Sequence, residues 1–354
     1  MRVELRISGI VALLACVVLA ACSGGQPTSG GAPSAKATAT TTPAAALHCK
    51  LPVTAGQTAS QQAGFISFPS GSFAADASSG TSYEIATMRY RTTQSPVLYG
   101  DSSSGTYDTA AGRWLPVAWT QVLPDGSAYA YTREASPTQS RNEIHVVDVA
   151  TAHDRVVFNQ SAYHVIAYTP EGIYVDFHLN GTDASSGLWL LDPTSGALKA
   201  FPAGRQATWM RIAGGAAWSY SVDGNRFGST SFARLDLATG QLATWFRVVS
   251  PTPPEPGSKS IRLVGVNGSE AVVQVYIDEH TSEVWRLTGP GQATRLSDIP
   301  LGALSPPFTV TDSHGMWLIA GDGAVYLYAG KAFDRVAVAP TNTTPGYAVA
   351  GRCS

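Results

Sequence analysis

A strand–turn–strand pattern recurs through most of this 354-residue chain and restricts the folds that the chain can adopt. Five segments place an alternating apolar strand before a turn and a second strand after it: IHVVDVATAHDRVVF, LWLLDPTSGALKAF, FARLDLATGQLATWF, VWRLTGPGQATRLS and VYLYAGKAFDRVAV. TYDTAAGRWLPV is a sixth segment with a shorter first strand. An aspartate just before such a turn accepts backbone N–H bonds, so we expect a structural role for it. The aligned positions are 40, 44, 44, 52 and 41 residues apart: Asp108, Asp148, Asp192, Asp236, Thr288 and Ala329.

A second repeated element precedes most of these hairpins and consists of a tight turn followed by another strand. The segments LPDGSAYAYTRE, TPEGIYVDFHL, GVNGSEAVVQVYID and TDSHGMWLIAG have this form, and FPSGSFAAD begins the series. We expect Pro69, Pro124 and Pro170 to occupy equivalent places. Each repeat then carries four strands in roughly 44 residues, which is typical of a propeller blade. Because one such sheet cannot bury both faces alone, a ring of blades would supply the core.

The segment PDGSAYAYTREASPTQSRNEIHVVDVATAHDRVV resembles the WD40-like PDG repeat of the TolB propeller family. The resemblance covers residues 64–338, with the other repeats degenerate, and it supports the fold more than an activity. The predicted fold class is therefore an all-β protein, a β-propeller over residues 49–354. Six blades are favoured and seven are possible, because a period of 44 leaves nearly one blade spare. We assign that excess, residues 75–105, to an insertion in the first blade.

The N-terminus reads as an export signal. Arg2 and Arg6 precede an apolar run over residues 7–21, which is too short to span a bilayer comfortably. The following LAAC motif resembles the lipobox of bacterial lipoproteins, which implies cleavage before Cys22 and lipid on its sulfur and its new amino group. The alternative is an incidental cysteine after an ordinary secretory signal. We thus expect a signal peptide over residues 1–21 and an extracytoplasmic protein whose lipid at Cys22 anchors it to a bacterial membrane.

Two cysteines remain once the export signal and the lipid site are set aside. Residues 22–48 are mainly Ser, Gly, Thr, Ala and Pro, so they are expected to form a flexible tether that cannot bury a core. Cys16 would leave with the signal peptide, and the body would keep Cys49 and Cys353 in an oxidising compartment. We predict a disulfide between them that closes the ring, with the strand in GYAVAG beside the N-terminal region. The alternative is two separate free thiols.

Several functional classes find no support in the sequence. A net charge of -2 without a run of lysine or arginine argues against nucleic-acid binding. The chain lacks the G-x-S-x-G, H-E-x-x-H, Walker and C-x-x-C motifs. We predict no metal and no cofactor, although a divalent cation at Asp278, Glu279, His280 and Glu283 is an alternative. His145 is expected to be a packed strand histidine, since it stands where other repeats carry packing aromatics: Trp189, Trp285 and Tyr326.

A possible binding rim follows from the lengths of the loops. In a propeller, loops between the second and third strands of a blade share a face with the loops between blades. On that face the loops are long and varied, and they include the insertion SPTPPEPGSK. Loops on a rigid scaffold often carry function. The predicted rim residues are Arg133, Glu134, Arg141, His178, Asp183, Asp223, Arg226, Asp278, Glu279 and His280.

The sequence favours a tethered, non-catalytic propeller that binds a protein, a peptide or another ligand. TolB-like propellers generally act as interaction modules, and this expectation comes from the resemblance. The alternative is a propeller hydrolase or lyase acting on a cell-envelope glycan, which would require paired carboxylates. Whether the chain is an enzyme is left open, with the balance against it. We expect a monomer that contacts the membrane through Cys22 and has another envelope protein or peptide as its partner.

Overall fold

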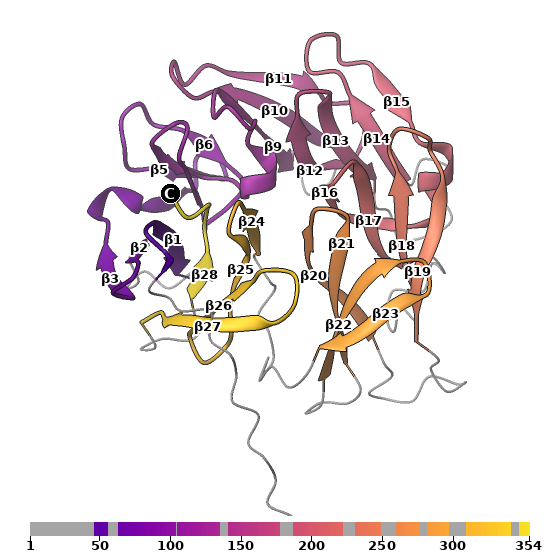
Figure 1. The fold of residues 1–354 in the computed structure, drawn as a ribbon. Coiled ribbons are helices and arrows are strands. Elements are labelled where there is room, and N and C mark those ends of the chain that lie inside the picture. Colours follow the sequence, from indigo (N-terminus) through magenta and orange to yellow (C-terminus); the bar gives the residue numbers. More distant parts are fainter. Residues whose placement is uncertain are drawn as a thin grey trace, which may run out of the picture. The chain divides into compact units, whose positions relative to one another are not determined.

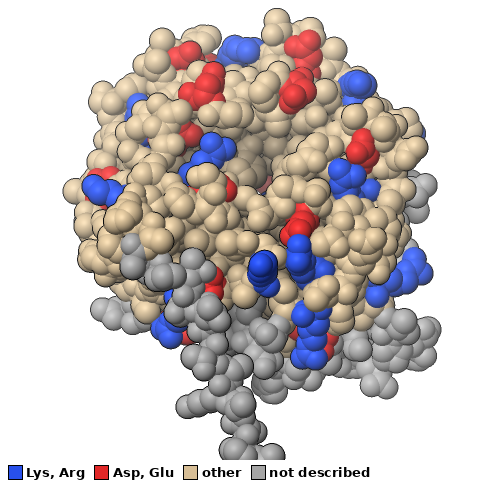
Figure 2. All heavy atoms as spheres, viewed as in Figure 1, with Lys and Arg blue, Asp and Glu red and all other residues tan. Residues whose placement is uncertain are grey.

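The described residues of the computed structural model belong to the unit of residues 40–354 and form an all-β fold (Figure 1). Three short 3-10 turns interrupt the strands: η2 (Ala77–Ser79), η3 (Trp119–Gln121) and η4 (Pro202–Gln206). Among the described residues, no helix is long and apolar enough to cross a membrane. Figure 2 shows positive and negative side chains interspersed over one face. The structure describes residues 46–55, 63–103, 105–134, 141–177, 187–221, 231–248, 260–276, 282–296, 309–340 and 347–354.

The strands form antiparallel sheets that are the blades of a propeller, numbered here along the chain. Blade 1 joins the two ends of the described chain, and blade 2 combines two small sheets. In blade 3 an isolated bridge between Val122 and Tyr129 takes the place of a fourth strand. The bounds in blade 1 are β1 (Lys50–Ala55), β2 (Gly64–Ser67), β3 (Ser72–Ala75) and β28 (Tyr347–Val349); in blade 2 β4 (Thr81–Glu84), β5 (Arg89–Thr92), β6 (Tyr99–Gly100), β7 (Thr106–Asp108) and β8 (Arg113–Leu115); in blade 3 β9 (Ala128–Glu134), β10 (Asn142–Asp148) and β11 (Asp154–Phe158).

Blades 4 to 7 are regular four-stranded sheets whose strands pair in chain order. The bounds in blade 4 are β12 (Tyr163–Thr169), β13 (Gly172–Phe177), β14 (Gly187–Leu191) and β15 (Leu198–Ala200); in blade 5 β16 (Thr208–Ala213), β17 (Ala216–Ser221), β18 (Ser231–Asp236) and β19 (Leu242–Arg247); in blade 6 β20 (Ser260–Asn267), β21 (Glu270–Tyr276), β22 (Ser282–Gly289) and β23 (Gln292–Leu296); in blade 7 β24 (Val310–Asp312), β25 (Gly315–Ile319), β26 (Ala324–Tyr328) and β27 (Phe333–Val338).

The core lies between the blades. Seven hydrophobic clusters of described residues each join two neighbouring blades. The cluster that contains Ile66 and Trp317 connects blade 7 back to blade 1, so the ring is complete. Trp189, Trp285 and Tyr326 belong to or pack against three of these clusters. Their predicted packing role is therefore confirmed.

The prediction of six blades was wrong, because residues 75–105 form no insertion in blade 1. They supply β4 to β6, and this sheet continues into the β7–β8 hairpin through a hydrogen bond from the Ser102 N–H to the Pro116 carbonyl (3.0 Å). Separate hydrophobic clusters join this combined unit to blade 1 on one side and to blade 3 on the other. It is therefore a full seventh blade that lacks the repeat signature in its first half.

The three prolines do not occupy equivalent places, so the alignment that we predicted for them was wrong. Pro124 and Pro170 lie in turns that lead into β9 and β13, each the second position of its blade. Pro69 instead lies between β2 and β3, the third and fourth strands of blade 1. Blade 1 takes its first strand, β28, from the C-terminus. The chain therefore enters the ring at the second strand of blade 1. The FPSG turn joins the third and fourth strands of that blade, as the turns of the strand–turn–strand segments do in other blades.

The six predicted strand–turn–strand segments are all hairpins, and their aspartates have the predicted structural role. Asp148 and Asp236 accept backbone N–H bonds from residues three positions later, and Asp192 accepts one from Thr194 (2.7 Å). At Asp192, which is exposed, the backbone N–H bonds from Thr194 and then Ser195 lower the pKa of the carboxyl. The carboxylate thus replaces the missing acceptor of each turn.

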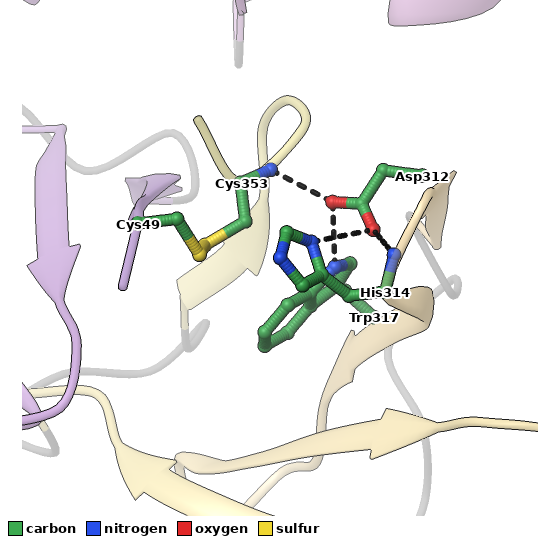
Figure 3. The surroundings of a disulfide bond; sticks show 5 residues. All are labelled: Cys49, Asp312, His314, Trp317 and Cys353. Carbon is green, nitrogen blue, oxygen red and sulfur yellow. Dashed lines mark hydrogen bonds and ion pairs between the residues drawn. A yellow bond between two sulfur atoms is a disulfide. The ribbon is translucent and has the colours of Figure 1, made fainter. Parts of the chain in front are cut away.

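The C-terminal residues close the ring as predicted (Figure 3). β28 pairs with β1, with Val349 opposite Val53, and the Cα atoms of Cys49 and Cys353 are 5.4 Å apart in a disulfide. The Asp312 carboxylate adds a link to blade 7, because it accepts hydrogen bonds from the Cys353 backbone N–H (2.9 Å) and the Trp317 indole (2.8 Å). The C-terminus is therefore held covalently, by strand pairing and by a buried carboxylate.

Candidate functional site

A pocket of about 160 Å³ lies where the inner parts of the blades converge. Every blade except blade 6 contributes to its lining. Figure 2 shows the face of the ring hollowed near its middle. Most of the lining is apolar or carries hydroxyl groups, and Asp108 and Arg352 are the charged residues among the lining side chains of the described chain. Such an apolar concavity with few polar groups is the usual form of a ligand site.

One wall of the pocket depends on two turns that pack together, the turn after β7 and the PDG turn before β9. The Asp108 carboxylate accepts the Ala111 N–H (2.7 Å) and so fixes the turn of the β7–β8 hairpin. The PDG turn before β9 packs directly on it, because a Cβ built at Gly126 would lie 2.4 Å from the Asp108 Oδ1 atom. Gly126 also has a φ of 70°, which favours glycine. The PDG motif therefore brings blade 3 against blade 2 at the pocket.

Arg211, Trp119 and Thr309 form a cross-link at the channel that we call the channel triad. The Trp119 indole N–H donates to the Thr309 carbonyl (3.0 Å), and the Arg211 Nη1 donates to the Thr309 hydroxyl (2.9 Å). The Arg211 guanidinium carbon lies 5.6 Å from the centroid of the Trp119 ring. The Thr309 hydroxyl in turn donates to the Val264 carbonyl (2.8 Å). The channel triad thus connects blades 3, 5, 6 and 7.

Burial shapes the electrostatics of the channel triad. Removal from solvent lowers the pKa of the Arg211 guanidinium to about 10, because the charged form loses hydration. In many proteins a neighbouring carboxylate compensates a buried guanidinium for this loss of hydration. Among the described residues, no carboxylate forms an ion pair with Arg211. Within the described part of the chain, the positive charge of Arg211 is met by the neutral oxygens of Thr309 and by the aromatic face of Trp119.

A second polar cluster lies between blades 2 and 3, around His145. Its Nδ1 lies 2.7 Å from the Asp154 Oδ1, its Nε2 lies 3.2 Å from the Glu143 Oε2, and its ring stacks on Tyr131. Arg89 pairs with the other oxygen of Asp154 (2.7 Å). Burial acts to raise the pKa of Asp154, but hydrogen bonds and these charges outweigh it and lower the pKa. His145 is thus the satisfied strand histidine that the sequence predicted.

Three of the predicted rim residues lie in the described part of the chain. Arg133 and Glu134 are the last residues of β9, and Arg141 is exposed just before β10. The Arg133 guanidinium lies 3.5 Å from the Glu143 carboxylate, so this rim residue connects to the His145 cluster. The rim stays a prediction. The remaining candidates lie outside the described residues: His178, Asp183, Asp223, Arg226, Asp278, Glu279 and His280.

The alternative cation site at residues 278–283 also falls mostly outside the described residues, which include Glu283 alone of its four members. Within the described ranges, no group of three or more His, Cys, Asp or Glu side chains is placed to hold a metal ion. Glu283 instead accepts a hydrogen bond from the Trp285 indole (3.1 Å) and pairs with Arg295. Both contacts of Glu283 are with residues of its own strand, β22, and the neighbouring strand, β23.

The channel triad was not predicted from the sequence. Arg211 lies in TWMRIAGG, and its charge inside an otherwise apolar strand is the one local signal that could have singled it out. Trp119 and Thr309 lie in short irregular segments without repeat features. They are 190 residues apart, and only closure of the ring brings them together.

Comparisons with known proteins concern the fold alone. No family model matches the chain, and no curated protein matches it. Among solved structures, the acylaminoacyl peptidase of Pyrococcus horikoshii is similar, with 11% identity and a TM-score of 0.44 over 83% of this chain and 47% of that one. This chain therefore spans about half the length of that peptidase.

Two further structures have comparable similarity. TolB from Acinetobacter baumannii has 15% identity and a TM-score of 0.37, over 74% of this chain and 63% of that one. The β-propeller domain of the Trilobed protease from Pyrococcus furiosus has 14% identity and a TM-score of 0.44, over 71% and 81%. TolB is thus among the solved structures to which this chain is similar. At these values no activity is transferred from any of them.

Proposed function

We propose that this chain is a lipid-anchored extracytoplasmic protein whose propeller is a non-catalytic binding module. The observation that carries the proposal is the pocket in the central channel. Its walls come from every blade except blade 6, so its shape depends on closure of the ring, and its apolar lining with few polar groups suits recognition of a ligand. The partner would be an envelope protein, a peptide or a smaller ligand with a group that enters this pocket.

Anchoring and location form the second half of the proposal. Lipid on Cys22 would hold the protein at the membrane, and residues 22–48 would let the propeller stand away from the surface. The Cys49–Cys353 disulfide supports an oxidising compartment, since such bonds persist there. Replacing Cys22 by serine in the full chain should abolish palmitate labelling and move the protein from the membrane fraction to the soluble fraction. Unchanged membrane fractionation of that variant would contradict the anchor.

Site-specific photo-cross-linking in native membranes tests the binding module. A photoreactive amino acid at Thr109, which is exposed and lines the pocket, should give a discrete adduct whose partner mass spectrometry identifies. The matched control is Val156, which is 46% exposed on the outer strand β11. Adducts from Thr109 that are absent from Val156 would support the proposal. Equal labelling at both positions, or none, would contradict it.

The alternative of a glycan hydrolase or lyase can be tested with the same protein. Such an enzyme needs two carboxylates that face the scissile bond. Among the described acids, Glu143 and Asp154 are the pair gathered around a histidine, and both are bonded to that ring. Release of soluble fragments from purified envelope glycan by the native chain, lost in Asp154→Asn, would replace the binding proposal with this one.

A further inference from the structure

We propose that the central channel recognises a carboxylate of its ligand, and that the Arg211 guanidinium binds it. This inference rests on the proposed binding function and names the chemistry of the ligand. It starts from one unusual feature, a positively charged side chain inside the channel that has no described anionic partner.

Arg211 has one edge occupied and one edge available. All its hydrogen bonds within the described structure use Nη1, which donates to the hydroxyl and carbonyl oxygens of Thr309. Neither Nε nor Nη2 has a hydrogen-bond partner among the described residues. Neither belongs to the buried polar atoms that lack a partner, so both have some access to solvent. The Nε–Nη2 edge therefore faces accessible space. This edge of a guanidinium can hold the two oxygens of a carboxylate in a bidentate pair.

The orientation of that edge is fixed in advance. Thr309 is fully buried and holds Nη1, while the Trp119 ring packs against the guanidinium plane. A side chain held on one edge and one face loses little further freedom when a ligand binds to the other edge. Such pre-organisation is unnecessary for a structural arginine on a blade surface.

The charge of Arg211 is balanced differently from that of other arginines in the sheets. Arg89, Arg234 and Arg286 each pair with a carboxylate of the chain. Arg211 has no such pair among the described residues, and burial lowers its pKa because the charge is poorly hydrated. A ligand carboxylate would supply the missing counter-charge in a place where water screens weakly. In the lining of the pocket itself, Arg352 adds a second positive charge and Asp108 adds a carboxylate, which accepts the Ala111 N–H.

The pocket beside the channel triad is lined by Trp119 of the triad but not by Arg211 itself, and its volume limits the part of the ligand that enters it. Its volume of about 160 Å³ corresponds to roughly five water molecules in the liquid. Trp119, Ile212 and Val310 give it apolar walls. A short aliphatic group that carries a carboxylate fits both the volume and the lining. The C-terminal residue of a peptide and a small free carboxylic acid share this chemistry.

Side-chain NMR of the intact, oxidised propeller tests the proposal directly. The protein is labelled with 15N-arginine, and the Nε–Hε signal of Arg211 is identified by its loss in Arg211→Lys. N-acetyl-alanine and isobutyrate, which represent a chain end and a free acid, are titrated against their uncharged amides. We expect either acid to shift the Arg211 signal in a saturable manner while its amide does not. The tighter of the two acids identifies the source of the carboxylate.

Variants of the protein provide the matched controls. Arg211→Lys keeps the charge but loses the bidentate edge. Since this variant has no Arg211 signal, its binding is measured by isothermal titration calorimetry, and it should bind the acid roughly 10- to 100-fold more weakly than the native protein. Arg247→Gln removes an exposed charge on β19 and should leave binding unchanged. If acid and amide act alike, or if neither shifts the Arg211 signal, the carboxylate site is refuted. Cross-linking from Thr109 would still decide the binding module, so the two failures can be told apart.

Discussion

At the scale of single residues, the buried carboxyl group of Asp176 is a source of pH dependence. Its Oδ2 accepts the Trp209 N–H of the next blade (3.1 Å), while its Oδ1 has no partner among the described residues. Burial raises the pKa of this carboxyl from 3.8 to about 7, despite the hydrogen bonds from Trp209 and Phe177 that lower it. The folded protein therefore binds this proton more tightly than the unfolded chain does.

The sign of the effect follows from that difference. The contribution of Asp176 is complete below about pH 4 and is lost as the pH rises toward 7, by at most about 4 kcal/mol. In Asp176→Asn this loss should be absent, so the stability of the variant relative to the native protein should increase between pH 4 and 8. Urea unfolding at several pH values measures it. Parallel pH profiles of the two proteins would show that Asp176 does not titrate in this range.

Asp101 provides a matched control for that experiment. The residue as a whole is exposed, but its carboxyl lies against β9, where loss of hydration raises its pKa to about 6 although Thr132 and Gln121 donate hydrogen bonds to it. The native protein should therefore lose less stability through Asp101 than through Asp176 as the pH rises, and this loss should end at a lower pH. Asp101→Asn should remove it. The two carboxyl groups lie at different blade interfaces, so their effects should add in the double variant.

At the scale of elements, the PDG turn illustrates what a local motif determines. Gly126 and Gly112 both have positive φ angles, 70° and 63°, but only Gly126 is closely approached by another turn. Gly112→Ala should cost about 1 kcal/mol for its backbone conformation alone. Gly126→Ala should cost several times more, because its Cβ would displace the Asp108 carboxylate and separate blades 2 and 3. Chemical unfolding of both variants measures the difference, and equal costs would contradict the packing role.

The hairpins could be predicted because their determinants are local. An aspartate that accepts N–H groups a few residues later, with glycine in the turn, specifies a reversal without reference to the rest of the chain. The first half of blade 2 lacks this pattern: β4 and β5 are joined by IATM, with Met88 at a φ of 52°. Its strands are held by contacts with blade 3, because Leu98 lies in the cluster shared with that blade and Arg89 donates to Tyr131 and Asp154. The sequence of the segment alone does not encode these contacts.

At the scale of the whole molecule, the candidate site is a product of closure. Arg211 and Thr309 are 98 residues apart, and Trp119 and Thr309 are 190 residues apart, so no spacing in the sequence associates them. The rim, by contrast, was inferred from loop lengths, and it stays a prediction because most of its residues lie outside the described part. The pairing of Cys49 with Cys353 was predictable because only two thiols were expected in the mature body.

Closure also determines how the ring should respond to loss of its covalent link. The disulfide spans 304 residues, and its removal frees the ends of the unfolded chain. Its measured contribution should be about 2–4 kcal/mol, below the ceiling of the chain-entropy model. Because β28 still pairs with β1 and Asp312 still accepts the backbone N–H of residue 353, Cys353→Ser should fold but melt at a lower temperature. A reductant should lower the melting temperature of the native protein to that of the variant and leave the variant unchanged. Equal melting temperatures of the two oxidised proteins would mean that strand pairing alone closes the ring.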